Sequence, residues 1–311
     1  MHKLAQGILK KNTRALAKAI SLVEQEAKEK DEILKELFRE TGNAFRIGVT
    51  GPPGAGKSSL VNQLISLIRS NNLSVAVVAV DPSSSLSGGS ILGDRIRMNN
   101  YYEDKEVYIR SISNGGKLGG LFENAIDVVR LLDAYGFDII ILETVGVGQS
   151  ELEVMKVVDT TCLVLNPNSG DSVQVYKAGI MEIANIFIIN KADLPGKGKL
   201  KMEIESSMDT LKPKNKWVPP VIETICTSNP LGINTLWNSI NDHKKSVELE
   251  HDDLKSEMLL EEVLRKLNQK IENYYMGKYK RDLNTKISEV LQGQNAPYSV
   301  VESLFHTFKR W

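Results

Sequence analysis

Residues 51–59 read Gly51-Pro52-Pro53-Gly54-Ala55-Gly56-Lys57-Ser58-Ser59, and this stretch decides the fold. It satisfies the pattern G-x-x-x-x-G-K-[ST], and it lies between an apolar run at 45–50 and a predicted helix that opens at Lys57. Glycines let successive backbone N–H groups point inward as an anion nest, and the helix N-terminus adds its positive dipole end. In such a loop Lys57 bridges the β- and γ-phosphates and the Ser58 hydroxyl ligates Mg²⁺. A chance match in a glycine-rich turn is the alternative, and the strand–loop–helix context argues against it.

Short apolar runs surround the loop and predict the rest of the domain. They cover residues 45–50, 75–80, 107–112, 138–142, 161–165, 186–189 and 221–225. Their Val and Ile content, with apolar residues at consecutive positions, is typical of strands buried on both faces of a mostly parallel sheet. Helical stretches alternate with them. The sequence therefore predicts an α/β fold, a P-loop NTPase with a mostly parallel central sheet flanked by helices.

Helical patterns without strands occupy both ends of the chain. Apolar residues recur at helical spacing before residue 42, where Gly42 is a candidate C-cap. After about residue 240 a helical stripe is formed by Leu260, Val263, Leu264, Leu267 and Ile271. Further helices are expected at 283–291 and 299–308. We expect an N-terminal helical segment at 1–42, a P-loop GTPase domain at 43–247 and a C-terminal helical arm at 248–311.

The base is predicted by Asn190-Lys191-Ala192-Asp193, which follows the run at 186–189. In an N-K-x-D tetrad at a strand end, the Asp carboxylate accepts both N1–H and N2–H₂ of guanine. Adenine offers no such donor pair, so the carboxylate selects the base. Asn190 and Lys191 are expected to brace the loop and cover the base. A surface turn is the alternative, and the place of the tetrad after a P-loop and a strand favours guanine.

Polar segments follow two further strands at the same predicted edge of the sheet. Asp81 comes directly after the run at 75–80, and Glu143 comes directly after the run at 138–142. A carboxylate in this place can hold Mg²⁺ or its water ligands, and Gly146 can offer a backbone N–H to the γ-phosphate. Solvated loops are the alternative for each segment taken alone. Their shared position favours a role at the phosphates.

Composition bounds the possible partners and the compartment. Acidic and basic residues number 39 each among 311 residues, so the total charge favours neither nucleic acid nor a membrane surface. No stretch approaches the roughly 20 apolar residues of a membrane span, and no signal peptide is evident. The two cysteines, Cys162 and Cys226, form no disulfide framework. We expect a soluble, cytoplasmic protein.

A family resemblance rests on longer motifs. Residues 81–84, 88–94 and Arg97-Met98, then 143–150 and 179–184, are similar to the signature of GTPase chaperones of adenosylcobalamin-dependent acyl-CoA mutases. The best-known members serve methylmalonyl-CoA mutase, and older names call some of them transport-system kinases for lysine, arginine and ornithine. The first helix also fits, at 14–20 and 22–24. The resemblance covers roughly residues 12–243.

The resemblance implies roles for particular residues. Asp81 and Asp94 would belong to the first switch and Glu143 to the second, so that all three join Ser58 around Mg²⁺. Three polar residues would belong to a third switch that faces the mutase, namely Asp171, Gln174 and Lys177. The helical arm would be a dimerisation arm, which makes a homodimer the expected state. The stripe of Leu and Ile supports an interface independently, although a helix folded back onto its own domain would show the same pattern.

Two departures from the family pattern concern recognition. The loop behind the guanine usually reads Ser-Ala or Ser-Gly, whereas this chain has Cys226-Thr227-Ser228. Because that loop usually reaches guanine O6 through backbone N–H groups, we expect these three residues still to bind the base. The segment 111–117 also differs from better-known members, which bears on the partner surface it fits.

The expected reaction is hydrolysis of GTP by an in-line water, with Lys57 and Mg²⁺ stabilising the developing charge. Gln149 and Arg95 are both candidates for the missing catalytic group, so a slow, partner-stimulated rate is expected. Three alternatives stay open: a nickel-enzyme maturation GTPase, a transport-system or protein kinase, and a module that binds GTP without hydrolysing it. Four scattered histidines and no C-x-x-C pair disfavour the first, and no residue marks an acceptor site for the second. The switch carboxylates argue against the third.

Overall fold

The computed structural model describes residues 1–81, 101, 103–113, 120–144, 146, 149–167, 180–210, 217–227, 229–249 and 251–308. Its centre is a seven-stranded sheet in the order β3-β2-β4-β1-β5-β6-β7, and every pair of neighbouring strands is parallel. The strands are β1 Phe45–Thr50, β2 Val75–Asp81, β3 Val107–Ser113, β4 Ile139–Thr144, β5 Thr160–Leu165, β6 Ile186–Asn190 and β7 Val221–Thr224. Every strand predicted from the apolar runs is present. The fold class is confirmed.

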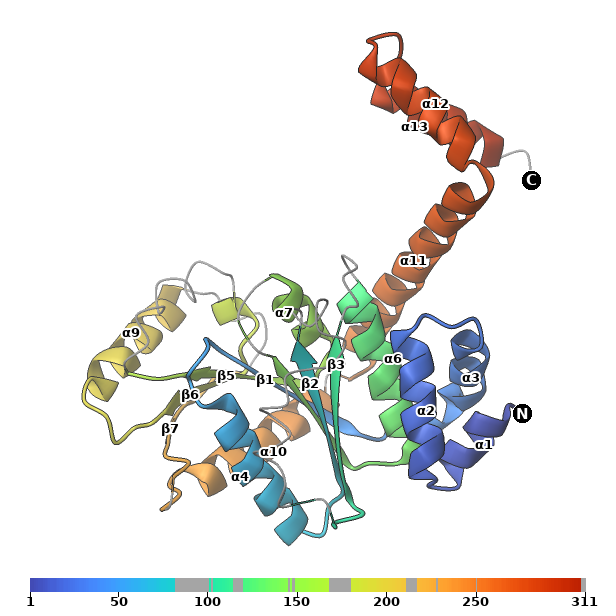
Figure 1. Cartoon of the computed structure of the whole chain (residues 1–311). Helices are drawn as coiled ribbons and strands as arrows, with labels where there is room; N and C mark the ends of the chain where they lie inside the picture. Colours follow the sequence, from blue (N-terminus) through green and yellow to red (C-terminus); the bar gives the residue numbers. More distant parts are fainter. Residues whose placement is uncertain are drawn as a thin grey trace. The chain divides into compact units, whose positions relative to one another are not determined.

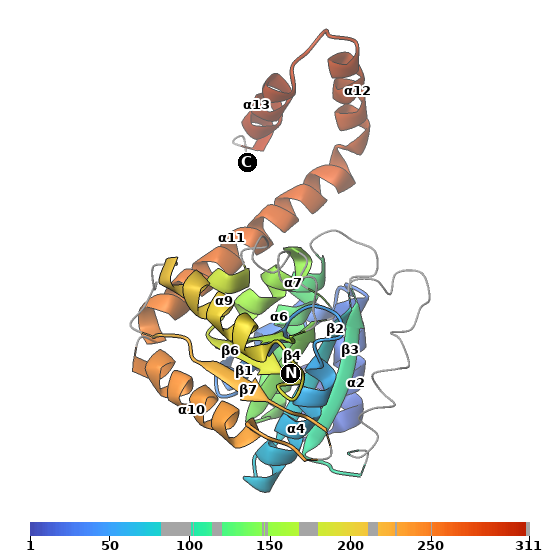
Figure 2. The same cartoon turned by 90° about the vertical axis from the view of Figure 1, so that its left-hand side faces the viewer.

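Helices cover both faces of the sheet (Figures 1 and 2). Those of the α/β layers are α4 Lys57–Ser70, α6 Gly120–Tyr135, α7 Gln149–Val154, α9 Lys197–Thr210 and α10 Ile233–Leu249. Before the sheet come α1 Lys3–Leu9, α2 Thr13–Glu24, α3 Lys30–Leu37 and the 3-10 turn Phe38–Glu40. Further 3-10 turns span Met155–Val157 and Ile180–Glu182.

Three buried clusters pack these helices onto the sheet. One joins α4 and α10 to β1, with Leu64, Ile47 and Ile240 fully buried. A second joins the N-terminal helices and α6 to the opposite face, and a third seats α9 on β5 and β6. Burial of a large aliphatic side chain contributes about 1.5–3 kcal/mol. The N-terminal helices therefore share a core with the sheet.

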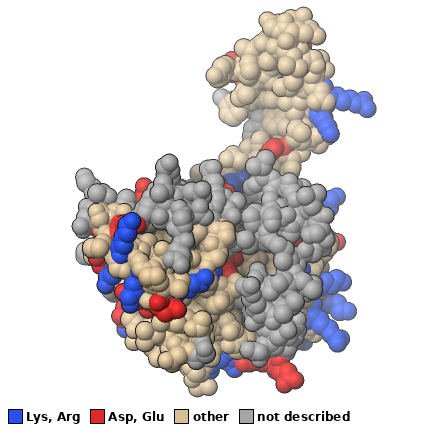
Figure 3. Space-filling view, turned by 60° about the vertical axis from the view of Figure 1, so that its left-hand side comes forward, with Lys and Arg blue, Asp and Glu red and all other residues tan. Residues whose placement is uncertain are grey.

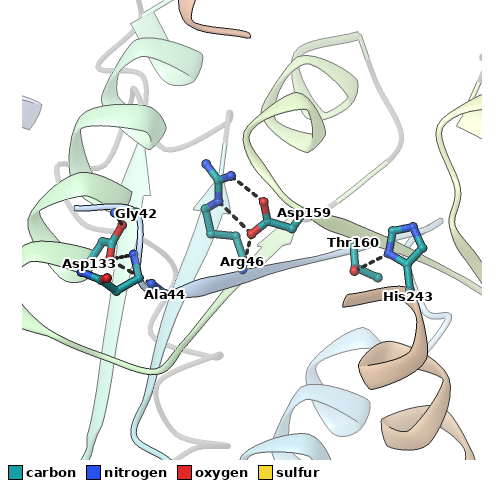
Figure 4. Close-up of polar contacts among 8 residues, drawn as sticks. Gly42, Ala44, Arg46, Asp133, Asp159, Thr160 and His243 are labelled. Carbon is teal, nitrogen blue, oxygen red and sulfur yellow. Dashed lines mark hydrogen bonds and ion pairs between the residues drawn. The ribbon is translucent and has the colours of Figure 1, made fainter. Parts of the chain in front are cut away.

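Polar contacts fasten the edge of the sheet where the strands begin (Figure 4). Arg46 of β1 and Asp159, just before β5, form a bidentate ion pair, and the Arg46 backbone N–H donates to the same carboxylate at 2.8 Å. His243 of α10 lies 2.7 Å from the hydroxyl of Thr160 through Nδ1. These contacts hold β1, β5 and α10 together. They therefore fix the positions of the two strands as they run to the opposite edge of the sheet, where the strands end.

The helical segment ends at Thr41-Gly42 as predicted, with Thr41 as the C-cap and Gly42 directly after it. The helix ends at Leu37 and continues as a 3-10 turn, while Gly42 takes a positive φ of 98°. Its N–H donates to the Asp133 carboxylate of α6, which also accepts the N–H of Ala44. Because Asp133 satisfies these donors, the entry to β1 is tied to α6, in addition to its contact with the preceding turn, where Asn43 Nδ2 donates to the Glu40 carbonyl at 3.3 Å.

The chain divides into two compact units, Met1–Glu248 and Leu249–Trp311. The second unit contains α11 His251–Lys278, α12 Lys280–Leu291 and α13 Pro297–Phe308. Pro297 is the first residue of α13, where its missing N–H has no cost. Within this unit the Tyr275 hydroxyl donates to the Leu304 carbonyl at 2.6 Å, which ties α11 to α13. On α11, the side chains of Leu260 and Val263 are 60% and 62% exposed.

Charges on the first unit are mixed in sign. Figure 3 shows acidic and basic side chains close together on part of its surface. The same unit contains ion pairs of partly exposed side chains, such as Lys197–Glu223 at 2.9 Å. Such pairs contribute little to stability, in the range of about 0–1 kcal/mol. Among the described residues, no helix is both long and apolar enough to span a membrane.

Candidate functional site

The predicted site residues gather where the strands end. The loop after β1 lies between the ends of β4 and β5, because β1 pairs with both strands in parallel. β6 ends at Asn190, one strand further along. In open parallel sheets, ligands bind in the crevice outside the carboxyl ends of the strands. The structure thus brings the predicted phosphate loop, residues 51–59, and the predicted guanine tetrad, residues 190–193, to the same edge of the sheet.

Glycines allow the phosphate loop its conformation. Gly51, Gly54 and Gly56 have φ angles of 148°, 75° and 92°, in the region that residues with a Cβ rarely adopt. A Cβ on Gly51 would lie 2.1 Å from the Val164 carbonyl oxygen of β5, and one on Gly56 would lie 2.3 Å from Nδ2 of Asn190. Both positions therefore require glycine for shape as well as for φ.

Lys57 lies at the start of α4 with its ammonium folded over the loop. Nζ donates to the carbonyl oxygens of Gly51 and Pro52 at 2.8 and 3.0 Å, and the residue is buried. These contacts keep the positive charge beside the backbone that would surround phosphate oxygens. In its predicted role, Lys57 Nζ would exchange these carbonyl acceptors for phosphate oxygens.

Ser58 and Glu143 meet across the loop. The Ser58 hydroxyl donates to Oε1 of Glu143 at 2.7 Å. Glu143, which was predicted to follow the strand, is the second-last residue of β4. Two oxygens this close can reach one cation, and hard oxygen ligands are those that Mg²⁺ prefers. The pair therefore fits a Mg²⁺ ion, which when bound supplies positive charge beside the phosphates.

Gly146 is held beside the same strand ends. Its carbonyl oxygen accepts the hydroxyl of Thr144 at 3.1 Å and that of Thr50 at 3.3 Å. Thr144 also donates to Thr50 at 2.9 Å, and both threonines are fully buried. The two hydroxyls anchor the chain after β4 to β1, next to the phosphate loop.

The guanine tetrad is fastened directly to the phosphate loop. Asn190 Nδ2 donates to the Ala55 carbonyl at 2.9 Å, and Lys191 Nζ donates to the Gly54 carbonyl at 3.0 Å. Lys191 has a positive φ of 57°, which turns the chain sharply after β6. Asp193 is exposed on this turn, where its carboxylate can reach a ligand. The predicted bracing by Asn190 and Lys191 is present as hydrogen bonds.

Two residues that sequence reasoning missed, Thr224 and Gln63, support the tetrad together with Cys226, which was predicted to lie behind the base. The Thr224 hydroxyl donates to Asn190 Oδ1 at 3.2 Å, and the Cys226 thiol donates to the same oxygen at 3.3 Å. Gln63 of α4 donates from Nε2 to the Cys226 carbonyl at 3.3 Å. Thr224 could have been found from strand register, because it pairs with Asn190 between β6 and β7. Gln63 and the thiol of Cys226 carry no pattern that predicts these contacts.

The loop behind the predicted base site is closed by backbone pairing. Ile225 and Leu231 exchange two N–H···O bonds at 3.1 and 3.0 Å. The Ala192 N–H also donates to the Thr224 carbonyl at 3.1 Å, which joins this loop to the tetrad. Cys226 and Thr227 lie at the start of the closed loop.

Some predicted site residues lie outside the described part of the chain. These are Asp94, Arg95, Asp171, Gln174, Lys177 and Ser228. The backbone of Asp81 ends β2 and that of Gln149 begins α7, so both flank the site, and their side chains are not described. The predicted residues whose side chains make hydrogen bonds at the described site include Lys57, Ser58, Glu143, Asn190, Lys191 and Cys226.

A model of the family described as Methylmalonyl Co-A mutase-associated GTPase MeaB matches residues 16–279 of the chain. The chain belongs to the MeaB family. The protein PH0274 of Pyrococcus horikoshii is 41% identical to it over 310 residues, which cover 96% of each protein. The GTPase ArgK of Escherichia coli is 39% identical over 257 residues, which cover 78% of this chain and 77% of ArgK. The crystal structure of a LAO/AO transport system kinase has a TM-score of 0.71 and 25% identity, and covers 99% of this chain and 97% of its own.

Membership of the MeaB family makes this protein a GTPase and confirms the predicted class of enzyme. It also confirms the resemblance first seen in the residues around Asp81 and Glu143. GTP and GDP are accordingly its nucleotides, and the P-loop fold is the one found in the solved structure of similar length.

Proposed function

We propose that this MeaB-family GTPase is a GTP-dependent chaperone that assists assembly, cofactor loading and protection of an adenosylcobalamin-dependent acyl-CoA mutase. The family description, which names association with methylmalonyl-CoA mutase, is the observation that carries this proposal, and it makes that mutase the first client to test. The physical support is a nucleotide site in which base loop, phosphate loop and proposed Mg²⁺ ligands are already connected.

Guanine is recognised by residues 190–193 in this proposal. Asp193 accepts the two N–H groups of the base edge, while Asn190 and Lys191 hold the tetrad against the phosphate loop. The backbone of Cys226 and Thr227, together with Ser228, backs the base. Discrimination against adenine follows because its edge would leave the Asp193 carboxylate without the donor pair that it accepts from guanine.

The phosphates lie in the loop of residues 51–59. Lys57 supplies positive charge and the backbone N–H groups surround the anion. Ser58 and Glu143 would hold Mg²⁺, with Asp81 and Asp94 as its further proposed ligands, and the ion would supply positive charge beside the phosphates. Gly146 lies beside the proposed γ-phosphate position, and Gln149 at the start of α7 orients the attacking water. In this scheme the protein contributes charge and positioning, which supply most of the acceleration in phosphoryl transfer.

The client completes the site in this proposal. Asp171, Gln174 and Lys177 would contact the mutase, and that contact would raise a slow intrinsic rate. A partner can raise the rate in this way only if it binds the hydrolysis-competent arrangement better than the resting one. The nucleotide state then reports to the mutase whether cofactor loading can proceed.

A second copy of the chain is proposed to cover the apolar stripe of α11. Leu260, Val263, Leu264 and Leu267 recur along this helix and are each about half exposed or more, at 60%, 62%, 51% and 49%. Burial of such a stripe against a like stripe is the driving force of helical dimers. Sedimentation velocity of the full chain tests this: Leu260→Glu with Leu264→Glu should shift the protein to monomer. If the parent protein itself sediments as a monomer, the dimer is excluded.

The experiment that tests the chaperone proposal is the GTPase rate of the purified protein with and without cobalamin-dependent mutases from the same genome. We expect one of them to raise the GTPase rate several-fold, with no hydrolysis of ATP in either condition. No stimulation by any mutase, with GTP still bound, would reject the client and leave the GTPase assignment standing.

Asp193→Asn tests the base site separately. The variant should lose GTP preference and gain affinity for xanthosine triphosphate, since an amide in place of the carboxylate can pair with the xanthine edge. Retention of full GTP preference would reject the assignment of residues 190–193 to the base.

A further inference from the structure

Asn190 has an orientation that its neighbours determine. Its Nδ2 faces the carbonyl oxygens of Ala55 and Gly56, at 2.9 and 3.4 Å. Carbonyl oxygens can only accept, so the amide nitrogen must lie on that side. Oδ1 therefore faces the other way, where it receives the Thr224 hydroxyl and the Cys226 thiol. Asn190 is almost wholly buried, so these protein groups define its orientation.

Gln63 fixes the other side of Cys226. It lies on α4, the helix that begins at Lys57 in the phosphate loop, and its amide donates to the Cys226 carbonyl at 3.3 Å. One helix thus begins at the proposed phosphate site and holds the loop behind the proposed base. The backbone of Cys226 is set by Gln63, while its side chain is directed at Asn190.

We propose that Cys226 and Gln63 are positioning residues for guanine: the Cys226 thiol orients Asn190 against the phosphate loop, and the Gln63 amide sets the backbone that faces the base. This inference rests on the assignment of residues 190–193 to guanine. Neither side chain is required to touch the reacting phosphate. Their effect is therefore on nucleotide affinity and base choice, and not on the chemical step.

The chemistry of the thiol agrees with this role. Burial raises the pKa of Cys226 to about 11, so the sulfur carries its proton at neutral pH and can donate it to Asn190. A thiol is a weak donor, and a serine hydroxyl in the same place is a stronger one. Cys226→Ser should therefore keep the contact, whereas Cys226→Ala removes it and leaves only Thr224 on Oδ1.

The test is the binding of fluorescent GDP and GTP analogues to the full chain, with steady-state GTPase kinetics beside it. Cys226→Ala and Gln63→Met should each raise Kd and KM about 3- to 10-fold, the range for loss of one hydrogen bond, while kcat stays within about twofold. Cys226→Ser should bind within about twofold of the parent protein. Gln6→Met, at an exposed position on α1, is the matched control for the glutamine change and should alter nothing.

Thiol labelling gives a measurement that needs no variant. The chain has two cysteines; Cys162 is wholly buried, whereas Cys226 is half-buried. N-ethylmaleimide should modify Cys226 first, as peptide mass analysis would show, and saturating GDP should slow that reaction several-fold. A labelling rate that GDP leaves unchanged would overturn the inference.

Failure of this inference differs from failure of the base site. Unchanged Kd in both Cys226→Ala and Gln63→Met, with base preference lost in Asp193→Asn, would reject the positioning role and keep the base site. A fall in kcat equal to the fall in kcat/KM would also reject it, because that result places Cys226 in the chemical step.

Discussion

Acid should weaken this fold through His243. The ring of this α10 residue is only 4% exposed, its Nδ1 lies 2.7 Å from the Thr160 hydroxyl, and Trp217 packs edge-on against it at 4.8 Å. Burial lowers the pKa of His243 from 6.5 to about 4, and the nearby Asp159 carboxylate opposes this lowering only in part. The buried ring is thus neutral over most of the range in which an exposed histidine gains a proton.

The sign follows from comparison with the unfolded chain. Unfolded His243 takes up its proton near pH 6.5, and folded His243 does so only near pH 4, so acid favours the unfolded state. The stability due to the neutral ring is complete above pH 6.5 and is lost as pH falls towards 4. The full loss amounts to about 3 kcal/mol, and about 2 kcal/mol of it falls between pH 7 and pH 5. The free energy of unfolding of a typical domain is about 5–15 kcal/mol, so this loss is a large share of it.

Urea unfolding at pH 7 and pH 5, followed by tryptophan fluorescence, to which Trp217 and Trp237 of the first unit contribute, measures this loss. His243→Asn keeps a polar atom near the Nδ1 position and does not titrate, so its loss between the two pH values should be smaller by about 2 kcal/mol. His306→Asn, an exposed histidine on α13, should behave as the parent protein. Equal losses in His243→Asn and in the parent protein would refute the reasoning. NMR titration of the His243 ring gives its pKa directly.

Two further predictions concern the loop and its frame. Lys57→Ala should lower the GTPase rate by about 100-fold or more, because the ammonium is the charge placed at the developing phosphate; phosphate release measures it, and a rate within threefold of the parent protein would reject the role. Arg46→Met should destabilise the first unit by about 1–2 kcal/mol, because the ion pair with Asp159 is lost. The two side chains are 23% and 16% exposed, so water screens part of their attraction. A double-mutant cycle with Asp159→Asn in urea isolates the pair, and strictly additive effects would show that it contributes nothing.

The strands could be predicted because a parallel sheet buried on both faces demands apolar residues at consecutive positions. Next to the proposed site, the predicted strands end one or two residues too early. Asp81, Glu143 and Asn190 each fall inside a strand, although each stands outside the apolar run that predicted it. A polar residue ends the run in the sequence, while backbone pairing continues to the edge of the sheet. Strand ends read from hydrophobicity therefore stop just before a site of this kind.

The supporting contacts could not be predicted for a different reason. Arg46 and Asp159 lie 113 residues apart, and Gln63 and Cys226 lie 163 apart. No local pattern relates such positions, because their meeting depends on the order of strands in the sheet. The tetrad and the phosphate loop could be recognised since their function needs fixed residue types at fixed spacing. Their supports need only a donor or an acceptor of the right reach, which many residues provide.

The contacts between the two recognition loops bear on how base and phosphates communicate. A phosphate loop turns its N–H groups towards the anion, so its carbonyl oxygens are left for other partners. Here the Gly54 and Ala55 carbonyls accept from Lys191 and Asn190, and those of Gly51 and Pro52 accept from Lys57. Movement of the base loop must therefore displace the backbone that surrounds the phosphates. A nucleotide whose base Asp193 rejects should therefore also bind more weakly through its phosphates. The preference for guanine should then be as strong among nucleoside diphosphates as among nucleoside triphosphates.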